Sequence, residues 1–138
     1  QHDKAVDPEE LLPPSLSGSM HKQVIADAQM LCDAFFSSSW YKKEVEPYSV
    51  SSEVGFFSVV EHEGREVVAE GSIDLLVKRD DHYLVVDFKT DRFRDEEVHR
   101  FQVETYMQAM RRIHQCPVKG CVVYLRDVQD IVIWEEET

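Results

Sequence analysis

The sequence predicts a single α/β (α+β) domain in which a mixed central sheet of about five strands is flanked by helices. Two segments, residues 20–36 and 95–114, repeat apolar side chains at steps of three and four, which is the period of an amphipathic helix. Five other segments are rich in β-branched and apolar residues and are bounded by turn-forming residues, which is typical of strands. A chain of 138 residues can bury one proper core, and the order helix, three strands, helix, two strands shows no internal repeat.

The chain is acidic and contains few cysteines. Its formal net charge is −12, from 27 acidic and 15 basic residues, which counts against tight, autonomous binding of nucleic acid. Cys32, Cys116 and Cys121 form no metal-ligand spacing, so neither zinc nor an iron–sulfur cluster is expected. No apolar run reaches membrane length and no signal peptide opens the chain, so we expect a protein of the reducing cytoplasm with no membrane partner.

Residues 1–20 carry the features of a linker or disordered arm. They combine prolines, serines, a glycine and acidic residues without a clear apolar period. The folded domain is therefore expected to span residues 21–138. The first residue is glutamine rather than methionine, which suits a piece of a longer chain.

The first helix is expected to end where three serines follow one another at residues 37–39. Trp40 and Tyr41 come next and are expected to pack at the helix exit. The strands are then expected at residues 48–61, 66–77, 82–89, 118–125 and 131–134, with a turn at Glu63 and Gly64. Glu53, in the first strand, is either a third acid near a site or, on the safer interpretation, a solvated position on an edge strand.

The second and third predicted strands form the most informative pattern in the chain. If Asp80 and Asp81 make a two-residue hairpin loop, facing residues have numbers that sum to 161, and Asp74 lies opposite Asp87. Lys89, two residues further along, then shares their face of the sheet. The other face would carry only apolar side chains, namely Ile73, Leu75, Val77, Leu84, Val86 and Phe88.

Two carboxylates that face each other repel, so this pattern indicates a divalent cation between them. Oxygen ligands of this kind suit Mg²⁺ or Mn²⁺. Lys89 beside the ion could orient a water nucleophile or stabilise charge on a phosphate. The alternative is that Asp74 merely ends a strand while Asp87 and Lys89 form a surface ion pair of little energetic weight. The cross-strand register and the apolar face behind it favour a site.

The helix at residues 95–114 is predicted to start with Asp95 as its N-cap. Its expected buried stripe comprises Val98, Phe101, Thr105, Ala109, Met110 and Ile113. Gln102 and Tyr106 fall inside that stripe, and polar groups on a buried face need partners. They either bond each other or nearby backbone as polar groups of the core, or they reach a site at the end of the sheet.

Together these motifs resemble the RecB-type branch of the PD-(D/E)XK nucleases, in particular the nuclease domain at the carboxy end of bacterial AddA/RecB helicase–nucleases. The matching stretches are Gly71-Ser72-Ile73-Asp74, Val85-Val86-Asp87-Phe88-Lys89-Thr90 and Gln102-x-x-x-Tyr106, preceded by Glu53-Val54-Gly55-Phe56. They stand in the order of that family and cover roughly residues 22–134. The resemblance implies a restriction-endonuclease-like core.

The resemblance also implies roles for individual residues. The implied catalytic residues are Asp74, Asp87 and Lys89, the implied metal ligands are Asp74, Asp87 and the Phe88 backbone carbonyl, and the implied supporting or DNA-positioning residues are Gln102 and Tyr106. The family also has an upstream Gly-x-x-x-His helix whose histidine completes the metal shell. Gly18 and His21 stand closer together than in that motif, so His21 is a weak candidate ligand and the true motif is expected outside this chain. The isolated fragment is accordingly expected to be weakly active or inactive.

The implied function is DNA phosphodiester hydrolysis with Mg²⁺ or Mn²⁺, most simply as an exonuclease, within an ATP-dependent helicase–nuclease of double-strand-break repair and recombination. DNA would arrive as a single strand fed by helicase domains of the parent chain, with an AddB/RecC-like subunit beside them. Any use of ATP would be confined to that helicase, because this chain has no phosphate-binding loop. The arginines available for the DNA backbone are Arg92, Arg94, Arg100, Arg111 and Arg112.

Two alternatives stay open. A catalytically silent, nuclease-like structural or partner-docking domain is favoured by the acidic charge and the missing histidine, whereas the intact carboxylates and lysine speak against it. A stand-alone RecB/Cas4-like nuclease is disfavoured by the lack of cluster cysteines.

Overall fold

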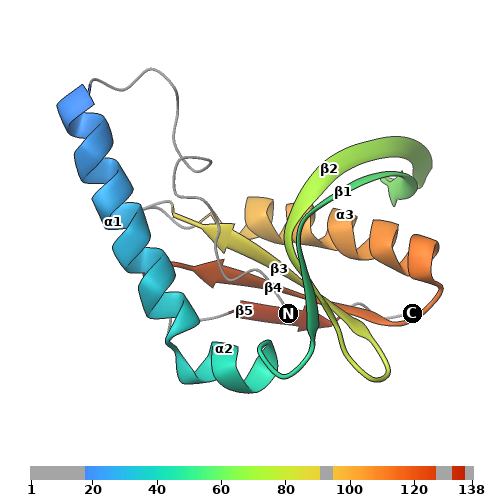
Figure 1. Ribbon diagram of the computed structural model, residues 1–138. Helices are drawn as coiled ribbons and strands as arrows, with labels where there is room; N and C mark the ends of the chain where they lie inside the picture. Colours follow the sequence, from blue (N-terminus) through green and yellow to red (C-terminus); the bar gives the residue numbers. More distant parts are fainter. Residues whose placement is uncertain (1–17, 91–94, 127–131, 136–138) are drawn as a thin grey trace.

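The computed structural model describes residues 18–90, 95–126 and 132–135 (Figure 1). Its elements are α1 (Gly18–Phe36), α2 (Ser39–Glu44), β1 (Ser49–His62), β2 (Arg65–Lys78), β3 (Tyr83–Lys89), α3 (Glu96–His114), β4 (Val118–Tyr124) and β5 (Val132–Glu135). Helix α1 begins two residues before its predicted start, and the rest of the predicted arm, residues 1–17, lies outside the described part. None of the described helices is both long and apolar enough to cross a bilayer.

Helix α2 is the one described element that the sequence pattern did not predict. The serines do end α1 at Phe36, but Ser38 then caps a new helix, because its side chain accepts a hydrogen bond of 3.2 Å from the Tyr41 N–H. Lys42 and Lys43 in its last turn suit the negative end of the helix dipole. Tyr41 is fully buried, as its expected packing at the exit of α1 requires.

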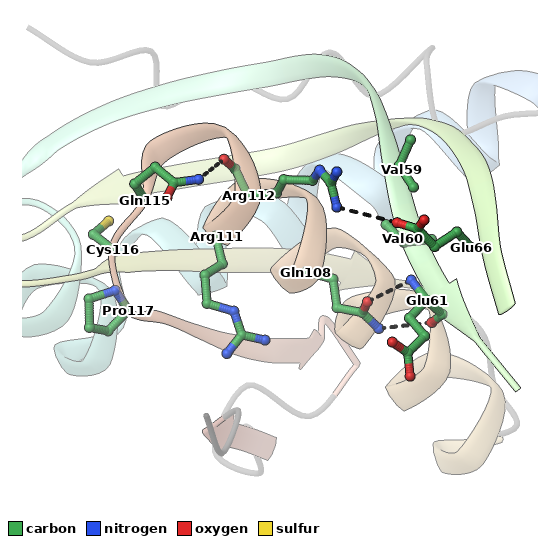
Figure 2. Close-up of a pocket in the computed structure, with 10 residues that line it drawn as sticks. All are labelled: Val59, Val60, Glu61, Glu66, Gln108, Arg111, Arg112, Gln115, Cys116 and Pro117. Carbon is green, nitrogen blue, oxygen red and sulfur yellow. Dashed lines mark hydrogen bonds and ion pairs between the residues drawn. The ribbon is translucent and has the colours of Figure 1, made fainter. Parts of the chain in front are cut away.

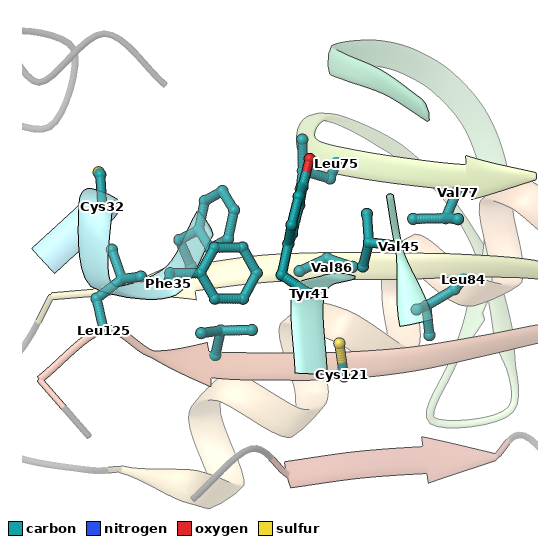
Figure 3. Close-up of a cluster of buried hydrophobic side chains, with 12 residues drawn as sticks. Cys32, Phe35, Tyr41, Val45, Leu75, Val77, Leu84, Val86, Cys121 and Leu125 are labelled. Carbon is teal, nitrogen blue, oxygen red and sulfur yellow. The ribbon is translucent and has the colours of Figure 1, made fainter. Parts of the chain in front are cut away.

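The five strands form one mixed sheet in the order β1-β2-β3-β4-β5, which agrees with the predicted fold class. Neighbouring strands are antiparallel except β3 and β4, which are parallel because α3 connects them. Helices α1 and α2 lie over one face of the sheet and α3 over the other (Figure 1). The core cluster under α1 and α2 is centred on Phe35, Tyr41 and Val86 (Figure 3).

The predicted register of the central hairpin is confirmed. Leu75 pairs with Val86 and Lys78 with Tyr83, and each pair sums to 161. The Arg79 N–H donates to the His82 carbonyl at 2.9 Å, which closes the two-residue loop in between. The residues that follow Leu75 and Val86 toward the end of the hairpin are Asp74 and Asp87.

The apolar face behind the hairpin differs from the prediction at Ile73. Ile73 packs under α3, whereas Leu75, which should share its face, packs under α1 and α2. Val50 and Val54 on β1 show the same exchange of faces. The pairing of β1 with β2 skips Glu53 and Asp74, and Glu53 has a φ of 51°, in the left-handed region that non-glycine residues seldom occupy. Asp74 therefore lies at a break in the pairing of β1 and β2, where the side chains of both strands exchange faces of the sheet.

Beyond that break, β1 and β2 continue as a two-stranded arm that arches over α3 (Figure 1). Glu63 and Gly64 form its tip with φ values of 52° and 75°, the positive values that a tight hairpin turn needs. This confirms the predicted turn.

The buried stripe of α3 is rotated from the predicted one by one residue, about 100° of helix. Val98, Phe101 and Ile113 are 60%, 43% and 49% exposed. Ala109 and Met110 are buried as predicted, and the other buried side chains are His99, Val103 and Met107. The reason lies in β4, where a Cβ on Gly120 would come within 2.5 Å of Val103 and Met107. Gly120 lets α3 approach the sheet along that line of side chains.

Candidate active site

Asp87 and Lys89 lie two residues apart on β3 and face α3, because side chains alternate along a strand. Asp87 is only 4% exposed, and its Oδ2 lies 3.0 Å from the Lys89 Nζ. The ion pair between Asp87 and Lys89 is thus largely buried. The alternative interpretation, in which these two residues form an ion pair on the surface, is wrong.

Gln102 and Tyr106 extend this pair into a chain of polar contacts from β3 to α3. The Lys89 Nζ donates to the Gln102 Oε1 at 2.6 Å, and the Gln102 Nε2 donates to the Tyr106 hydroxyl at 2.9 Å. Burial raises the pKa of the Tyr106 hydroxyl above its usual value of 10, so it stays neutral. The first predicted alternative is confirmed, since Gln102 and Tyr106 bond each other, and Gln102 also bonds Lys89; that they serve a functional site stays a prediction.

Gly71 and Phe56 hold the tyrosine in place. A Cβ on Gly71 would come within 2.9 Å of the Phe56 ring and 3.0 Å of the Tyr106 ring. The two rings meet edge to face, with centroids 5.4 Å apart and planes at 76°. Phe56 and Gly71, which face each other across β1 and β2, thus hold the Tyr106 ring between them and α3.

Asp74 reaches the same place from the break in β2. Its Oδ2 accepts a hydrogen bond of 2.7 Å from the Phe88 N–H. Burial raises the pKa of Asp74 to about 7; the bond from Phe88 opposes this shift, and the nearby Asp87 carboxylate adds to it. Asp74 therefore keeps its proton below about pH 7, and only when it loses that proton do the two acids carry more negative charge than Lys89 alone can balance.

The two acids also fit a hard divalent cation by their chemistry. Asp87 Oδ2 is buried and has no hydrogen bond within the described part of the chain, only its ion pair with Lys89. The Lys89 ammonium compensates the burial of this oxygen in part, and a divalent cation held between the two acids would add a second positive group. Among the described residues no three or more His, Cys, Asp or Glu side chains gather as a metal cluster. Mg²⁺ suits such a sparse set, because it keeps several waters and binds through one or two carboxylates.

The remaining predicted residues divide into those near the site and those elsewhere. His21 lies in α1, but its side chain is outside the described part, as are Arg92 and Arg94. Glu53 is exposed beside the strand break, in agreement with its interpretation as a solvated residue.

The other three arginines lie along α3. Arg100 pairs with Glu104 at 2.8 Å, and Arg112 lies 3.9 Å from Glu66 of the arm. Arg111 and Arg112 line a cavity of about 520 Å³ between the arm and the C-terminal half of α3 (Figure 2). In this cavity the Gln108 side chain bonds both the N–H and the carbonyl of Glu61, which fastens the arm to the helix (Figure 2). This cavity is separate from the candidate site, because neither Asp74, Asp87 nor Lys89 lines it.

A buried histidine next to the site was missed by the sequence analysis. His99 is 6% exposed, and its Nδ1 lies 3.0 Å from the Tyr124 hydroxyl. Tyr124 is the parallel-strand partner of Lys89, so this pair lies directly alongside the lysine. The signal was present: His99 is one helical turn before Gln102, and Tyr124 ends a buried strand.

The fold and the candidate site together define a class of protein. A mixed sheet with two acids and a lysine at the end of a central hairpin is of the kind found in nucleases. Comparison with known families gives the same answer, since the profile of the PD-(D/E)XK nuclease superfamily matches residues 3–135. The chain belongs to that superfamily.

Relatives among known proteins are components of helicase–nucleases. The chain is similar to an ATP-dependent helicase/nuclease subunit of Bacillus cereus (strain Q1), with 25% identity over 157 aligned positions that cover 93% of this chain. The protein of the same name in Bacillus cytotoxicus (strain DSM 22905 / CIP 110041 / 391-98 / NVH 391-98) is 28% identical over 126 positions, which cover 75% of the chain. The chain spans only 13% and 10% of the lengths of these two relatives.

The solved crystal structure of SSO0001 aligns with a TM-score of 0.42 and 14% identity, over 85% of this chain and 57% of that one. This likeness is too distant to add to the assignment.

Proposed function

We propose that this domain hydrolyses DNA phosphodiester bonds with Mg²⁺ or Mn²⁺, as an exonuclease within an ATP-dependent helicase–nuclease of double-strand-break repair. The observation that carries the proposal is the continuous contact chain from Asp87 through Lys89 and Gln102 to Tyr106, with Asp74 beside it. The buried Asp87 and the partly buried Asp74 beside it, with Lys89 paired to Asp87, support a metal-dependent reaction rather than a purely structural role.

Each residue of the chain has a distinct role in this proposal. Asp74, Asp87 and the Phe88 carbonyl would hold the cation. When bound, a divalent ion supplies an activated water and neutralises charge on the phosphate. Lys89 then orients the attacking water or stabilises the charge that develops on the phosphate oxygens. Gln102 fixes the lysine Nζ by a 2.6 Å hydrogen bond, and Tyr106 fixes the Gln102 amide in turn.

The wider context of the reaction follows from the relatives. Their name describes an ATP-dependent helicase/nuclease, and this chain corresponds to about an eighth of their length or less. We infer that residues 21–138 are the nuclease domain of a larger cytoplasmic chain of this kind. Its helicase domains, together with an AddB/RecC-like subunit, would deliver a single DNA strand and supply the positive charge that this acidic domain lacks.

The proposal is tested by removing one acid. Asp87→Asn keeps the size of the side chain but cannot hold a cation with the same charge, so Mn²⁺ binding by calorimetric titration and Mn²⁺-dependent cleavage of single-stranded DNA should both be lost. Asp80→Asn, an exposed acid on the hairpin loop, is the matched control and should behave like the wild type. Undiminished cleavage by Asp87→Asn would remove the basis of the assignment.

A silent docking domain is the second candidate, because the net charge is −12 and the described residues contain no cluster of three ligands. The silent domain and the nuclease domain differ in whether they bind Mn²⁺, which can be measured. A silent domain binds no Mn²⁺ at millimolar concentration, and its Asp74→Ala and Asp87→Asn variants match the wild type in calorimetry.

A further inference from the structure

An open cavity of about 410 Å³ lies on the N-terminal half of α3, next to the candidate active site. Glu97, Val98, Phe101 and Gln102 line it. Gln102 belongs to both places, since its amide bonds Lys89 and Tyr106 on the side of the site. A molecule in the cavity therefore touches the residue that fixes the catalytic lysine of the proposed reaction.

The apolar walls of this cavity are not part of the core. Val98 is 60% and Phe101 43% exposed, and the buried face of α3 points elsewhere. The Phe101 ring is nevertheless held in a fixed orientation. His62, at the end of β1, stacks on it with centroids 4.9 Å apart and planes at 14°. The ring is thus a preformed flat surface with little conformational freedom left to lose on binding.

We propose that Phe101, with Val98 beside it, is a stacking platform for one unpaired nucleobase of the DNA strand, at or next to the bond that is cut. This inference rests on the proposed function, which supplies the DNA strand. Aromatic side chains hold single-stranded nucleic acid by stacking on bases of any sequence. The platform would fix the position of the strand relative to Lys89 without reading its sequence.

The chemistry of the cavity selects a base rather than a phosphate. Its one charged wall is Glu97, which repels phosphate but can accept a hydrogen bond from the amino group of a base. Bases inside a duplex are covered on both faces by their neighbours, so only an unpaired base can lie on the ring. The occupant is therefore single-stranded DNA, with its phosphate on the lysine side and its base on the Phe101 side.

The test is a scan of the DNA strand with missing bases. This chain is titrated with a fluorescein-labelled octamer of thymidine at low ionic strength with Ca²⁺, and binding is followed by fluorescence anisotropy. A second series carries one abasic residue at each position in turn. Because stacking of one base is worth about 1–3 kcal/mol, the wild type should bind about tenfold more weakly when one particular base is absent.

Variants of the ring connect this loss to Phe101. Phe101→Ala should bind the intact octamer about tenfold more weakly and should no longer distinguish it from the abasic strands. Phe101→Trp keeps a stacking surface and should restore both properties, which separates stacking from a general loss of structure. Phe57→Ala is the matched control, because Phe57 is 71% exposed on β1 and does not line the cavity.

Three results would overturn the inference. The first is equal binding of the octamer by Phe101→Ala and the wild type, and the second is an abasic effect that persists in Phe101→Ala. The third is self-association of the wild type in sedimentation velocity that disappears in Phe101→Ala, which would make this patch a contact between copies of the chain. Cleavage in Mn²⁺ by the longer parent chain separates the inference from the proposed function. Normal cleavage with a flat abasic scan refutes the platform alone, whereas a clear scan without any cleavage supports the platform and refutes the nuclease.

Discussion

The effect of Asp74 on the free energy of unfolding can be measured without any substrate, and it reports the cost of holding Asp74 next to Asp87. Burial raises the pKa of Asp74 from 3.8 to about 7. The hydrogen bond from Phe88 lowers the pKa, and the nearby Asp87 carboxylate raises it further. Between these two pH values the folded protein binds a proton that the unfolded chain has lost. The free energy of unfolding of the ion-free protein therefore falls as the pH rises toward 7, and above that pH Asp74 adds no further change.

The size of the effect follows from the same shift. One pKa unit corresponds to about 1.4 kcal/mol, and pH 5 lies about two units below the pKa of Asp74. Asp74 should thus lower the free energy of unfolding by at most about 2.7 kcal/mol between pH 5 and pH 8, and by less where water screens this half-buried group. Asp74→Asn keeps an oxygen that can accept from the Phe88 N–H but carries no charge, so this part of the pH dependence disappears.

Urea unfolding in EDTA at pH 5, 6, 7 and 8 measures the difference. Subtracting the two curves removes every contribution that the wild type and Asp74→Asn share, and so isolates Asp74. Asp80→Asn, on the exposed hairpin loop, should follow the wild type. An Asp74→Asn curve parallel to the wild-type curve over this range would refute the reasoning about the acid pair. Added Mn²⁺ should stabilise the wild type at pH 8 but not Asp74→Asn.

Three further predictions concern neighbouring parts of the fold. Tyr106→Phe removes the hydroxyl that accepts from the Gln102 amide, so Mn²⁺-dependent cleavage should fall by roughly tenfold, about 1.4 kcal/mol, while the melting temperature changes little; an unchanged rate would contradict the role given to this hydroxyl. Gly120→Ala places a Cβ within 2.5 Å of two α3 side chains, and urea unfolding should show a loss of about 1–3 kcal/mol; equal stability would mean that α3 can move away at no cost. Burial raises the pKa of the Cys121 thiol, so in the native protein iodoacetamide followed by mass spectrometry should label the half-buried Cys116 far faster than Cys121; comparable rates would show that β4 opens readily.

Much of the fold follows from local patterns in the sequence. The turns at Glu63–Gly64 and Asp80–Asp81 fix the register of two hairpins, and the pairing of Leu75 with Val86 leaves Asp74 and Asp87 as the next residue on each strand. The capping role of Asp95 also follows from the sequence, and its side chain accepts from the Val98 N–H as expected.

What the sequence did not reveal depends on contacts between distant elements. The rotation of α3 is decided by the close approach at Gly120, and no pattern within the helix contains that information. The exchange of faces near Asp74 follows from the unusual backbone of Glu53, which breaks a period-two pattern that otherwise looks regular. Helix α2 is only 6 residues long, too short to show a helical period.

The arm formed by β1 and β2 has a consequence for how sequences of this family can vary in length. The pairing of β2 with β3 runs only from Leu75 to Lys78, so the part of β2 before the break pairs with β1 alone. Adding or removing one residue on each strand near the tip leaves the hairpin closed and the spacing between Asp74 and Asp87 unchanged. Such changes would alter how far the arm extends along α3, and with it the contacts of His62 with Phe101 and of Glu61 with Gln108. The reach of the domain toward its surroundings can thus evolve separately from its chemistry.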